Sequence, residues 1–195
     1  MADFLLPIRV GERMGSRLRH IALIAVGAAV VLASAQFVIR LPYTDVPITG
    51  QTFGVLLVGG ALGFRRGLMS IALYVAIGLI GLPFFAEHKG GVGVMFGGTG
   101  GYIIGFMVAA SVVGRLAELG WDRRILGALG AMAIGNVVIY LIGVPWLMVV
   151  HGFDLPTGIA LGLTPFLIGD AIKLILAAAA FPAAWWVVGR RAGEG

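Results

Sequence analysis

The feature that most constrains this chain is a series of long apolar stretches separated by short segments that carry most of its charges. Six stretches can be recognised, at residues 21–39, 51–64, 67–85, 102–119, 125–150 and 165–188. A helix needs about 20 predominantly apolar residues to cross a bilayer. Charged residues make up 12% of the 195 residues, against about 25% in soluble proteins. We therefore predict one all-α membrane domain with six transmembrane helices.

The distribution of basic residues predicts how these stretches are oriented. If each stretch crosses the membrane, 11 of the 14 lysines and arginines fall on the side of the N-terminus. Only Arg40 and Lys89 fall on the opposite side, and Lys173 lies within the last stretch. Cytoplasmic loops carry an excess of Lys and Arg. We therefore predict that both termini are cytoplasmic, with a tail over residues 1–19 and the membrane domain over residues 20–190.

The first stretch allows two interpretations. A basic segment followed by an apolar run that ends in Ala33-Ser34-Ala35 resembles a cleavable signal peptide. The apolar run is long enough to cross the membrane and the basic segment is long, so we expect the helix to be retained. Ala25, Ala29 and Ala33 lie four residues apart, hence on one helix face, where small side chains let another helix approach closely. That helix could belong to this chain or to a partner protein.

The strongest candidates for a binding site are Asp170 and Lys173, which lie inside the sixth stretch. A charged group in the membrane is costly and normally faces a partner, a cavity or a pathway. The spacing of three places both side chains on one helix face, where each can neutralise the other. Together they offer a carboxylate acceptor and an ammonium donor. The alternative is a structural ion pair, but two apolar side chains would pack there at lower cost, which favours a functional role.

Other polar residues could face the same site. Thr49, Gln51 and Thr52 lie at the outer end of the second stretch, whose 14 residues reach only about 21 Å. They either cap that helix or point into a cavity shared with Asp170. Asn136 lies in the middle of the fifth stretch, where it either bonds to a neighbouring helix or contacts a ligand.

Aromatic and glycine residues gather at the outer ends of the stretches. Phe53, Phe85, Tyr102 and Trp146 lie there, where aromatic residues usually form an interfacial belt; the alternative is a stacking wall for a flat ligand. The glycine-rich segment at residues 90–101 is either a flexible connector or a loop whose backbone packs closely on a ligand or a helix end.

Several classes of function are excluded or disfavoured. The chain contains no GxxxxGK[ST], HExxH or GxSxG motif. It has no cysteine, and its three histidines make no convincing metal set. Its basic residues lie in short clusters between apolar runs, which argues against binding of nucleic acid. We therefore expect a carrier or a binding subunit, without a cofactor, a metal or enzymatic activity.

Several multi-residue motifs make most of the chain similar to a known family. VPITGQTF at residues 46–53 resembles the VPxTxQT segment of the BioY family, the biotin-specific substrate-binding (S) components of energy-coupling-factor vitamin transporters. Further segments that resemble motifs of this family are LGFRRG at 62–67, GLIGLPFF at 78–85, GGTGGYIIGF at 97–106, GVPW at 143–146 and PFLIGDAIK at 165–173. The resemblance runs from about residue 20 to residue 190. Gly98 departs from it, because proline is expected there.

The resemblance implies a six-helix S-component fold in the bacterial cytoplasmic membrane, with a ligand pocket near the outer surface. It implies that Ala25, Ala29 and Ala33 pack on a transmembrane coupling subunit and that separate ATPase subunits supply energy. Transport by the chain alone is an alternative. An S component for another vitamin is disfavoured by the segments at 46–53 and 165–173, and an intramembrane enzyme by the missing nucleophile–base or metal set.

For biotin, the resemblance implies a site that recognises a planar ureido ring, an apolar ring and a carboxylate tail. Asp170 can accept a hydrogen bond from a ureido N–H, and Lys173 can donate to the ureido oxygen or hold the carboxylate. Charge complementarity does not decide between these roles of Lys173. Further polar contacts are expected from Gln51, Asn136 and Thr49, and apolar walls from Phe53, Tyr102 and Trp146.

Overall fold

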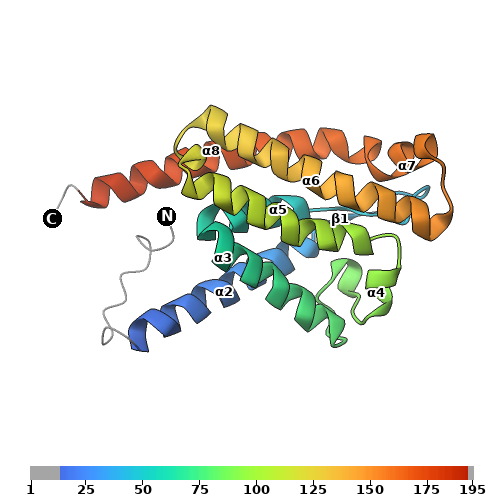
Figure 1. Ribbon diagram of the computed structural model, residues 1–195, viewed down its shortest axis with the longest axis horizontal. Coiled ribbons are helices and arrows are strands. Elements are labelled where there is room, and N and C mark those ends of the chain that lie inside the picture. Colours follow the sequence, from blue (N-terminus) through green and yellow to red (C-terminus); the bar gives the residue numbers. More distant parts are fainter. Residues whose placement is uncertain (1–13, 193–195) are drawn as a thin grey trace.

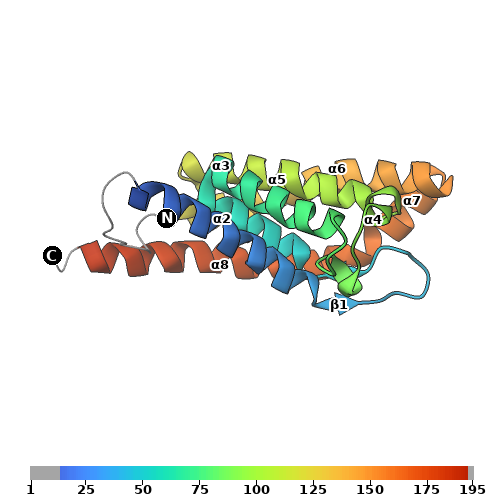
Figure 2. The same cartoon turned by 90° about the horizontal axis from the view of Figure 1, so that it is seen from below.

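The computed structural model describes residues 14–192, without the side chains of Met14, Ser16, Ala178 and residues 182–192. In chain order the elements are α2 (Met14–Ala35), β1 (Val38–Ile39), β2 (Ile48–Thr49), α3 (Gln51–Leu79), η1 (Ala86–His88), α4 (Gly93–Phe96), α5 (Gly100–Glu118), η2 (Trp121–Arg123), α6 (Ile125–His151), α7 (Leu155–Gly162), η3 (Thr164–Phe166) and α8 (Leu167–Ala192). Most of the predicted tail, residues 1–13, lies outside the described residues, and residues 14–19 belong to α2. The long helices form an elongated bundle (Figures 1 and 2).

Five helical stretches of the described chain are long and apolar enough to cross a membrane. They are Arg17–Ala35, Gln51–Leu79, Gly100–Glu118, Ile125–His151 and Leu155–Phe181. This agrees with a helical, multi-pass membrane protein. The number is one lower than predicted because the second and third apolar stretches join in a single element, α3.

α3 is broken at Gly63, whose backbone has φ 80° and ψ 179°. Only glycine adopts this conformation at little steric cost. The break separates two helical arms, residues 51–62 and residues 64–79. A Cβ atom placed on Gly67 would lie 3.0 Å from the Cα atom of Gly59, so the second arm folds back against the first.

A hydrogen bond joins the far ends of the two arms. The Gln51 side chain donates from Nε2 to the hydroxyl of Tyr74 at 2.7 Å, across 23 positions in the sequence. A straight helix would separate these residues by about 34 Å. α3 is therefore an antiparallel helical hairpin, with its turn at Gly63 and its open end at the polar start of the first arm.

Two predicted helix boundaries were wrong. The first helix ends at Ala35 rather than at residue 39, because Val38–Ile39 pairs antiparallel with Ile48–Thr49, and β-branched residues favour such pairing. The third stretch ends its helix at Leu79 rather than at residue 85. There Gly81 has φ 103° and a proline follows at position 83, and both features stop a helix. The short helix expected between the last two stretches is present as α7.

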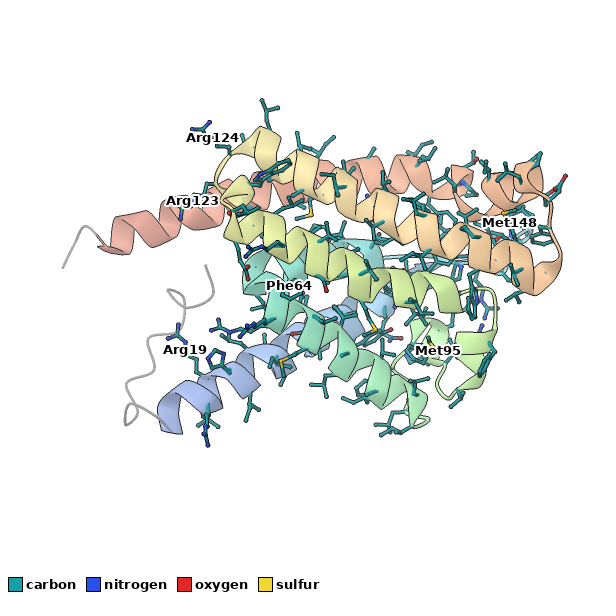
Figure 3. All side chains as sticks on the ribbon, viewed as in Figure 1. Arg19, Phe64, Met95, Arg123, Arg124 and Met148 are labelled. Carbon is teal, nitrogen blue, oxygen red and sulfur yellow. The ribbon has the colours of Figure 1, made fainter. Side chains whose placement is uncertain are left out.

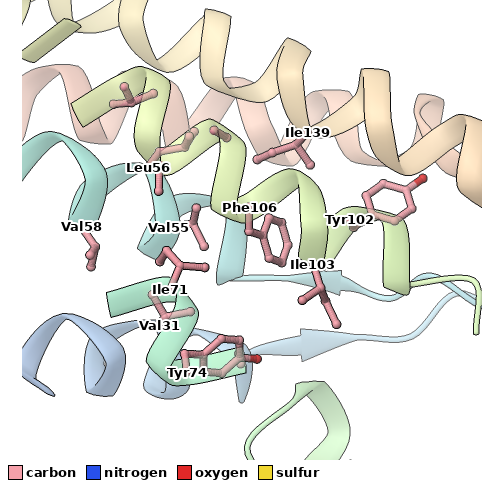
Figure 4. Packing of buried hydrophobic residues seen from close by; sticks show 14 of the residues in the cluster. Val31, Val55, Leu56, Val58, Ile71, Tyr74, Tyr102, Ile103, Phe106 and Ile139 are labelled. Carbon is pink, nitrogen blue, oxygen red and sulfur yellow. The ribbon is translucent and has the colours of Figure 1, made fainter. Parts of the chain in front are cut away.

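Close packing of small residues holds the bundle together. α5 lies between α3 and α6 (Figure 1). A Cβ atom on Gly59 of α3 would lie 2.6 Å from the Ala110 carbonyl oxygen of α5, and one on Gly105 would lie 3.1 Å from the backbone of Ile139 in α6. Such close approach gives van der Waals contact where lipid provides no hydrophobic drive between helices. Larger buried side chains, such as Phe106, fill the space that remains (Figure 4).

The two ends of the bundle differ in what they contain. The start of α2 and the end of α8 lie at the same end (Figures 1 and 2). The turn of α3 and the end of α5 belong to that end too, since Gly63 packs against Glu118. The opposite end holds the strand pair, α4 and α7, and most of the predicted site residues lie there.

Candidate binding site

The centre of the site is the ion pair between Asp170 and Lys173 on α8. Asp170 lies in the first turn of α8 and is 4% exposed. The Lys173 ammonium lies 3.0 Å from Asp170 Oδ1, so the spacing of three produces the predicted contact. Lys173 also donates to the Thr49 carbonyl oxygen at 2.8 Å and to the Thr52 hydroxyl at 2.9 Å. The ammonium is thereby fixed between α8 and the start of α3.

The second oxygen of Asp170 is bound from another helix. The Tyr140 hydroxyl of α6 donates to Asp170 Oδ2, and the Thr52 hydroxyl donates to Asp170 Oδ1 at 3.2 Å. A buried carboxylate is stable only when its lone pairs are used and its charge is balanced. Three helices therefore meet at this one side chain, and its position is set by tertiary contacts rather than by α8 alone.

These groups face a cavity at the end of the bundle that holds the strand pair. The cavity has about 710 Å³ of space, including the part open to solvent. Polar groups at its floor include Asp170, Lys173, Thr49, Gln51 and Thr52. Its apolar walls come from Phe85, Val94, Tyr102, Ile103, Phe106, Ile139 and Phe166, four of which appear with their neighbours in Figure 4. The arrangement suits a ligand with one polar end and an apolar body.

Gln51 and Thr49 are arranged as a unit at the start of α3. The Thr49 hydroxyl accepts from the Gln51 backbone N–H and donates to Gln51 Oε1, both at 3.2 Å. Gln51 is 6% exposed and also bonds to Tyr74. The Thr49 hydroxyl thus satisfies a backbone N–H at the start of α3, and both residues also line the cavity. The two alternatives predicted for them do not exclude each other.

The mouth of the cavity is lined by the charged side chains Asp45, Glu87 and Lys89. Glu87 forms ion pairs with Arg40 and with Lys89, the latter at 2.6 Å. The hydrogen bond from Arg40, followed by the one from Lys89, holds the pKa of Glu87 below its usual range. Glu87 and Lys89 line the cavity, whereas Arg40 lies in an adjoining depression. The long loop between α2 and α3 is thereby tied to the segment that follows α3.

The aromatic residues divide into two groups. Tyr102 and Phe85 are 6% and 1% exposed and line the cavity, so the interpretation of an interfacial belt was wrong for both. Burial follows from their neighbours, because Gly78 leaves room for the Phe85 ring and Gly143 for the Tyr102 ring. The Tyr102 hydroxyl donates to the Gly162 carbonyl oxygen at 2.7 Å, which fixes the ring.

Trp146 and Phe53 do not line this cavity. The Trp146 indole N–H donates to the Gly97 carbonyl oxygen at 3.0 Å, and a Cβ atom on Gly101 would lie 2.2 Å from the Trp146 side chain. The glycine-rich segment therefore packs closely on a helix end, as one of its two interpretations proposed, and Trp146 positions it. Phe53 lies one position beyond Thr52, on the side of a separate small cavity.

Asn136 lies beside the same separate cavity rather than in the main one. That small cavity, about 180 Å³, is lined by Thr52, Phe53, Asn136 and Lys173 among others. Asn136 is 7% exposed, and its buried Oδ1 has no hydrogen-bond partner within the described part of the chain. The expected bond to a neighbouring helix is therefore not formed by this oxygen. Thr52 and Lys173 line both cavities, whereas Asn136 lines only the small one.

Tyr140 and Phe166 were not predicted as site residues. Tyr140 lies one helical turn after Asn136, so it shares the face of α6 on which a polar residue was predicted to bond or to contact a ligand. A tyrosine in an apolar run, however, does not indicate a carboxylate partner on another helix. Phe166 directly precedes α8, and its ring lies 6.4 Å from that of Tyr140. Both belong to the cavity because α6 and α8 pack side by side there.

The alanine stripe of α2 lies on the outside of the molecule. Ala25, Ala29 and Ala33 are all exposed, whereas Leu23, Ala28 and Val31 of the same helix are buried against the bundle. Packing of the stripe within this chain, one of the two alternatives, is therefore excluded for the described residues. The stripe remains available to a partner helix.

Comparison with known proteins adds the family. The model of the BioY family matches residues 10–190, which is most of the chain. The chain belongs to the BioY family. Its relatives include the biotin transporter BioY of Thermotoga maritima, 40% identical over 140 residues that cover 72% of this chain and 81% of the relative. The probable biotin transporter BioY of Pyrococcus horikoshii is 38% identical over 156 residues, which cover 80% of this chain and 89% of that one.

A solved structure of similar fold is also known. It is the crystal structure, at 2.1 Å, of the S-component for biotin from an ECF-type ABC transporter. The two chains superpose with a TM-score of 0.81 at 26% sequence identity, over 89% of this chain and 94% of the other. The BioY chain described here therefore has the S-component fold, and the family resemblance expected from its motifs is confirmed.

Proposed function

We propose that this chain is a biotin uptake protein that binds biotin in the cavity around Asp170 and Lys173. The observation that carries the proposal is the buried, fully bonded ion pair at the floor of an apolar cavity, in a chain whose relatives are named biotin transporters. A fused ureido ring offers N–H donors and one carbonyl acceptor. Asp170 would accept from the N–H groups and Lys173 would donate to the oxygen, in exchange for part of their present bonds.

The remaining contacts follow from the shape of the cavity. Phe85, Tyr102 and Phe166 would enclose the apolar ring, and Gln51 and Thr49 would bond to polar edges of the ligand. The carboxylate tail would point to the mouth, where Lys89 carries a positive charge that Glu87 only partly balances because it is shared with Arg40. Lys173 is then free for the ureido group, which supports that one of its two alternative roles.

Titration calorimetry with the purified chain in detergent tests the proposal. We expect biotin to bind with submicromolar affinity, and riboflavin and thiamine to give no heat. Binding weaker than micromolar, or a preference for another vitamin, would contradict the biotin assignment. Biotin methyl ester tests the recognition of the carboxylate tail. If Lys89 recognises the tail, the ester binds more weakly than biotin to the parent chain, whereas the ester and biotin bind with equal affinity to the Lys89→Ala variant.

We infer six membrane crossings, with the two arms of α3 counted separately. The arms run antiparallel, and the positive-inside rule assigns the arginine-rich end to the cytoplasm. Because the chain has no cysteine, single cysteines can report sidedness without background. Six crossings place Phe37→Cys and Val92→Cys on the same, external side and Leu119→Cys inside. If α3 were a re-entrant hairpin that does not cross, Phe64→Cys at its turn would stay unlabelled from the cytoplasmic side by a membrane-impermeant maleimide, whereas six crossings expose it there.

The exposed alanine stripe supports a coupling subunit as partner. Ala25, Ala29 and Ala33 would let a helix of that subunit approach closely, and ATPase subunits would supply the energy. We expect Ala29→Leu to reduce co-purification of the coupling subunit without changing biotin affinity. Ala133→Leu, the same enlargement on the exposed face of α6, is the matched control. Equal co-purification of both variants would exclude the stripe as the contact, and no co-purification with the parent chain would leave it as a solitary carrier.

A further inference from the structure

The end of the bundle opposite the biotin cavity holds a second, larger hollow. This groove has about 2180 Å³ of space, including its open side, and lies between the start of α2, the turn of α3 and the end of α5. Figure 3 shows Arg123 and Arg124 at this end, far from Met95 and Met148 at the cavity end. None of the residues assigned to biotin lines the groove, so it has no role in the proposed binding site.

The groove is strongly basic. Five arginines line it, against the two carboxylates Glu118 and Asp122: the five are Arg17, Arg65, Arg66, Arg115 and Arg123. Glu118 is largely used within the fold, because it pairs with Arg115 at 3.0 Å and accepts from the Phe64 backbone N–H at 2.9 Å. The lining therefore carries an excess of three positive charges, and the groove attracts anions.

Two of these arginines have no partner in the part of the chain that the structure describes. Arg17 and Arg65 are both exposed, and neither forms an ion pair or a side-chain hydrogen bond with a described residue. Arg66, by contrast, is positioned by donating from Nε to His20 Nδ1 at 2.8 Å. The groove thus combines one guanidinium held in place with two that remain available to a ligand.

The other wall of the groove is apolar. Ile21, Phe64 and Met69 line it and are 64%, 40% and 54% exposed, and Ile24 and Leu62 lie beside them. The positive-inside rule accounts for arginines at this end, but not for a groove that joins them to exposed apolar side chains. A ligand that uses the whole groove must carry a negative head and a hydrocarbon tail.

We propose that this groove binds an anionic phospholipid of the cytoplasmic leaflet, with its phosphate on Arg17, Arg65 and Arg66 and an acyl chain along Ile21, Phe64 and Met69. Guanidinium groups bind phosphate oxygens in bidentate pairs, and basic pockets between helices on the cytoplasmic side of a membrane bind anionic headgroups. The inference depends on the proposed function only for the orientation of the bundle. A soluble phosphate compound would leave the apolar wall unused, and a neutral lipid would leave the arginines unused.

The groove borders the surface proposed for the coupling subunit. Ile21 lies four residues before Ala25, so it continues the exposed stripe of α2 into the groove. A bound lipid would therefore lie at the edge of that contact. The alternative is that the coupling subunit itself occupies the groove. An experiment without any partner protein distinguishes this alternative from a bound lipid.

Native mass spectrometry of the purified full-length chain provides the test. The chain is released from detergent after addition of phosphatidylglycerol or, at equal concentration, phosphatidylcholine of the same acyl chains. We expect phosphatidylglycerol to be retained at least about tenfold better, and the double variant Arg17→Gln/Arg65→Gln to lose most of this preference. Arg124→Gln, an exposed arginine at the same end but outside the groove, should keep it.

Two further measurements test whether the phosphate belongs to a lipid or to a soluble compound, and whether the apolar wall contributes to binding. Inorganic phosphate at millimolar concentration should not displace the lipid, and Met69→Gln should weaken retention of both lipids. Equal retention of the two lipids, equal retention by the double variant, or displacement by inorganic phosphate would each overturn the proposal. Loss of partner co-purification with unchanged lipid retention would instead assign the groove to the coupling subunit. Biotin affinity, measured in parallel, should stay unchanged in every variant.

Discussion

The two ends of this molecule both gather charge, but they do so in opposite ways. At the cavity end, Asp170 and Lys173 lie within a membrane-spanning helix, and each has two bonding partners outside that helix. At the arginine end the charges are more numerous, yet exposed, and Arg17 and Arg65 have no partner among the described residues. The difference in burial therefore gives the charges different roles. The buried pair can bind only a ligand whose polar groups match its geometry, whereas the exposed arginines orient the bundle in the membrane and attract anions.

The largest effect should follow from breaking the buried pair. We expect Asp170→Asn and Lys173→Ala each to lower biotin affinity at least about tenfold, which is about 1.4 kcal/mol or more. Each change removes a charge-assisted bond to the ligand and leaves the other charge buried without its counter-charge. Titration calorimetry measures the affinity, and Arg65→Gln, a charge removed from the opposite end, is the matched control.

Folding must be controlled in these variants. The double variant Asp170→Asn/Lys173→Met removes both charges together, so we expect it to be more stable than Lys173→Ala and still not to bind biotin. Thermal unfolding in detergent gives the stability. Near-normal biotin affinity in both single variants would refute the assignment of the site.

A second prediction concerns the turn at the arginine end, which connects the two arms of α3. Gly63→Ala should lower the free energy of unfolding by about 1–3 kcal/mol, because alanine is strained at a φ of 80° and its Cβ atom would lie 2.8 Å from Glu118 Oε1. Gly93→Ala is the matched control, since nothing lies within 4 Å of its Cβ position. If the two variants unfold alike, α3 does not depend on the glycine for its reversal.

A smaller effect is expected from the hydroxyl that orients Asp170. Tyr140→Phe should weaken biotin binding about threefold to tenfold, because one hydrogen bond contributes about 0.5–1.5 kcal/mol. The ring and the cavity wall stay in place. Tyr43→Phe, at an exposed tyrosine outside the cavity lining, should bind biotin as the parent does. Identical affinities for all three proteins would mean that Tyr140 supports the fold only.

The smallest effect should be the pH dependence of the mouth. The pKa of Glu87 is lowered in the folded protein by Arg40 and Lys89, so its stabilising contribution is present above the ordinary glutamate pKa and is lost as the pH falls through the lowered value. We expect the parent to be slightly more stable than Glu87→Gln at neutral pH and the difference to vanish on acidification. Melting temperatures of both proteins from pH 7 to pH 3 measure it, and a difference that grows toward acid would contradict this sign.

Comparison of sequence and structure explains which predictions succeeded. Apolar stretches of span length and the Asp170–Lys173 spacing depend on neighbours along the chain, and the helices and the ion pair formed as expected. A reversal between the second and third stretches was predicted, because two successive crossings require one, but the break at Gly63 and the hydrogen bond from Gln51 to Tyr74 were not. The ends of α2 and of the second arm were also misplaced, because strand pairing and Gly81 compete with helical periodicity there.

The sequence by itself determined that this is a helical membrane protein, which end carries the arginines, and which two charges lie inside the membrane. Those properties follow from hydropathy, charge and residue spacing, which act over a few turns of one helix. Only the tertiary structure decided that Tyr140 and Phe166 join the cavity, that Trp146 and Asn136 stand apart from it, and that Ala25, Ala29 and Ala33 face outward. Each of these depends on the rotation of one helix against another, which is set by close packing between helices, as where Gly105 of α5 lies against Ile139 of α6.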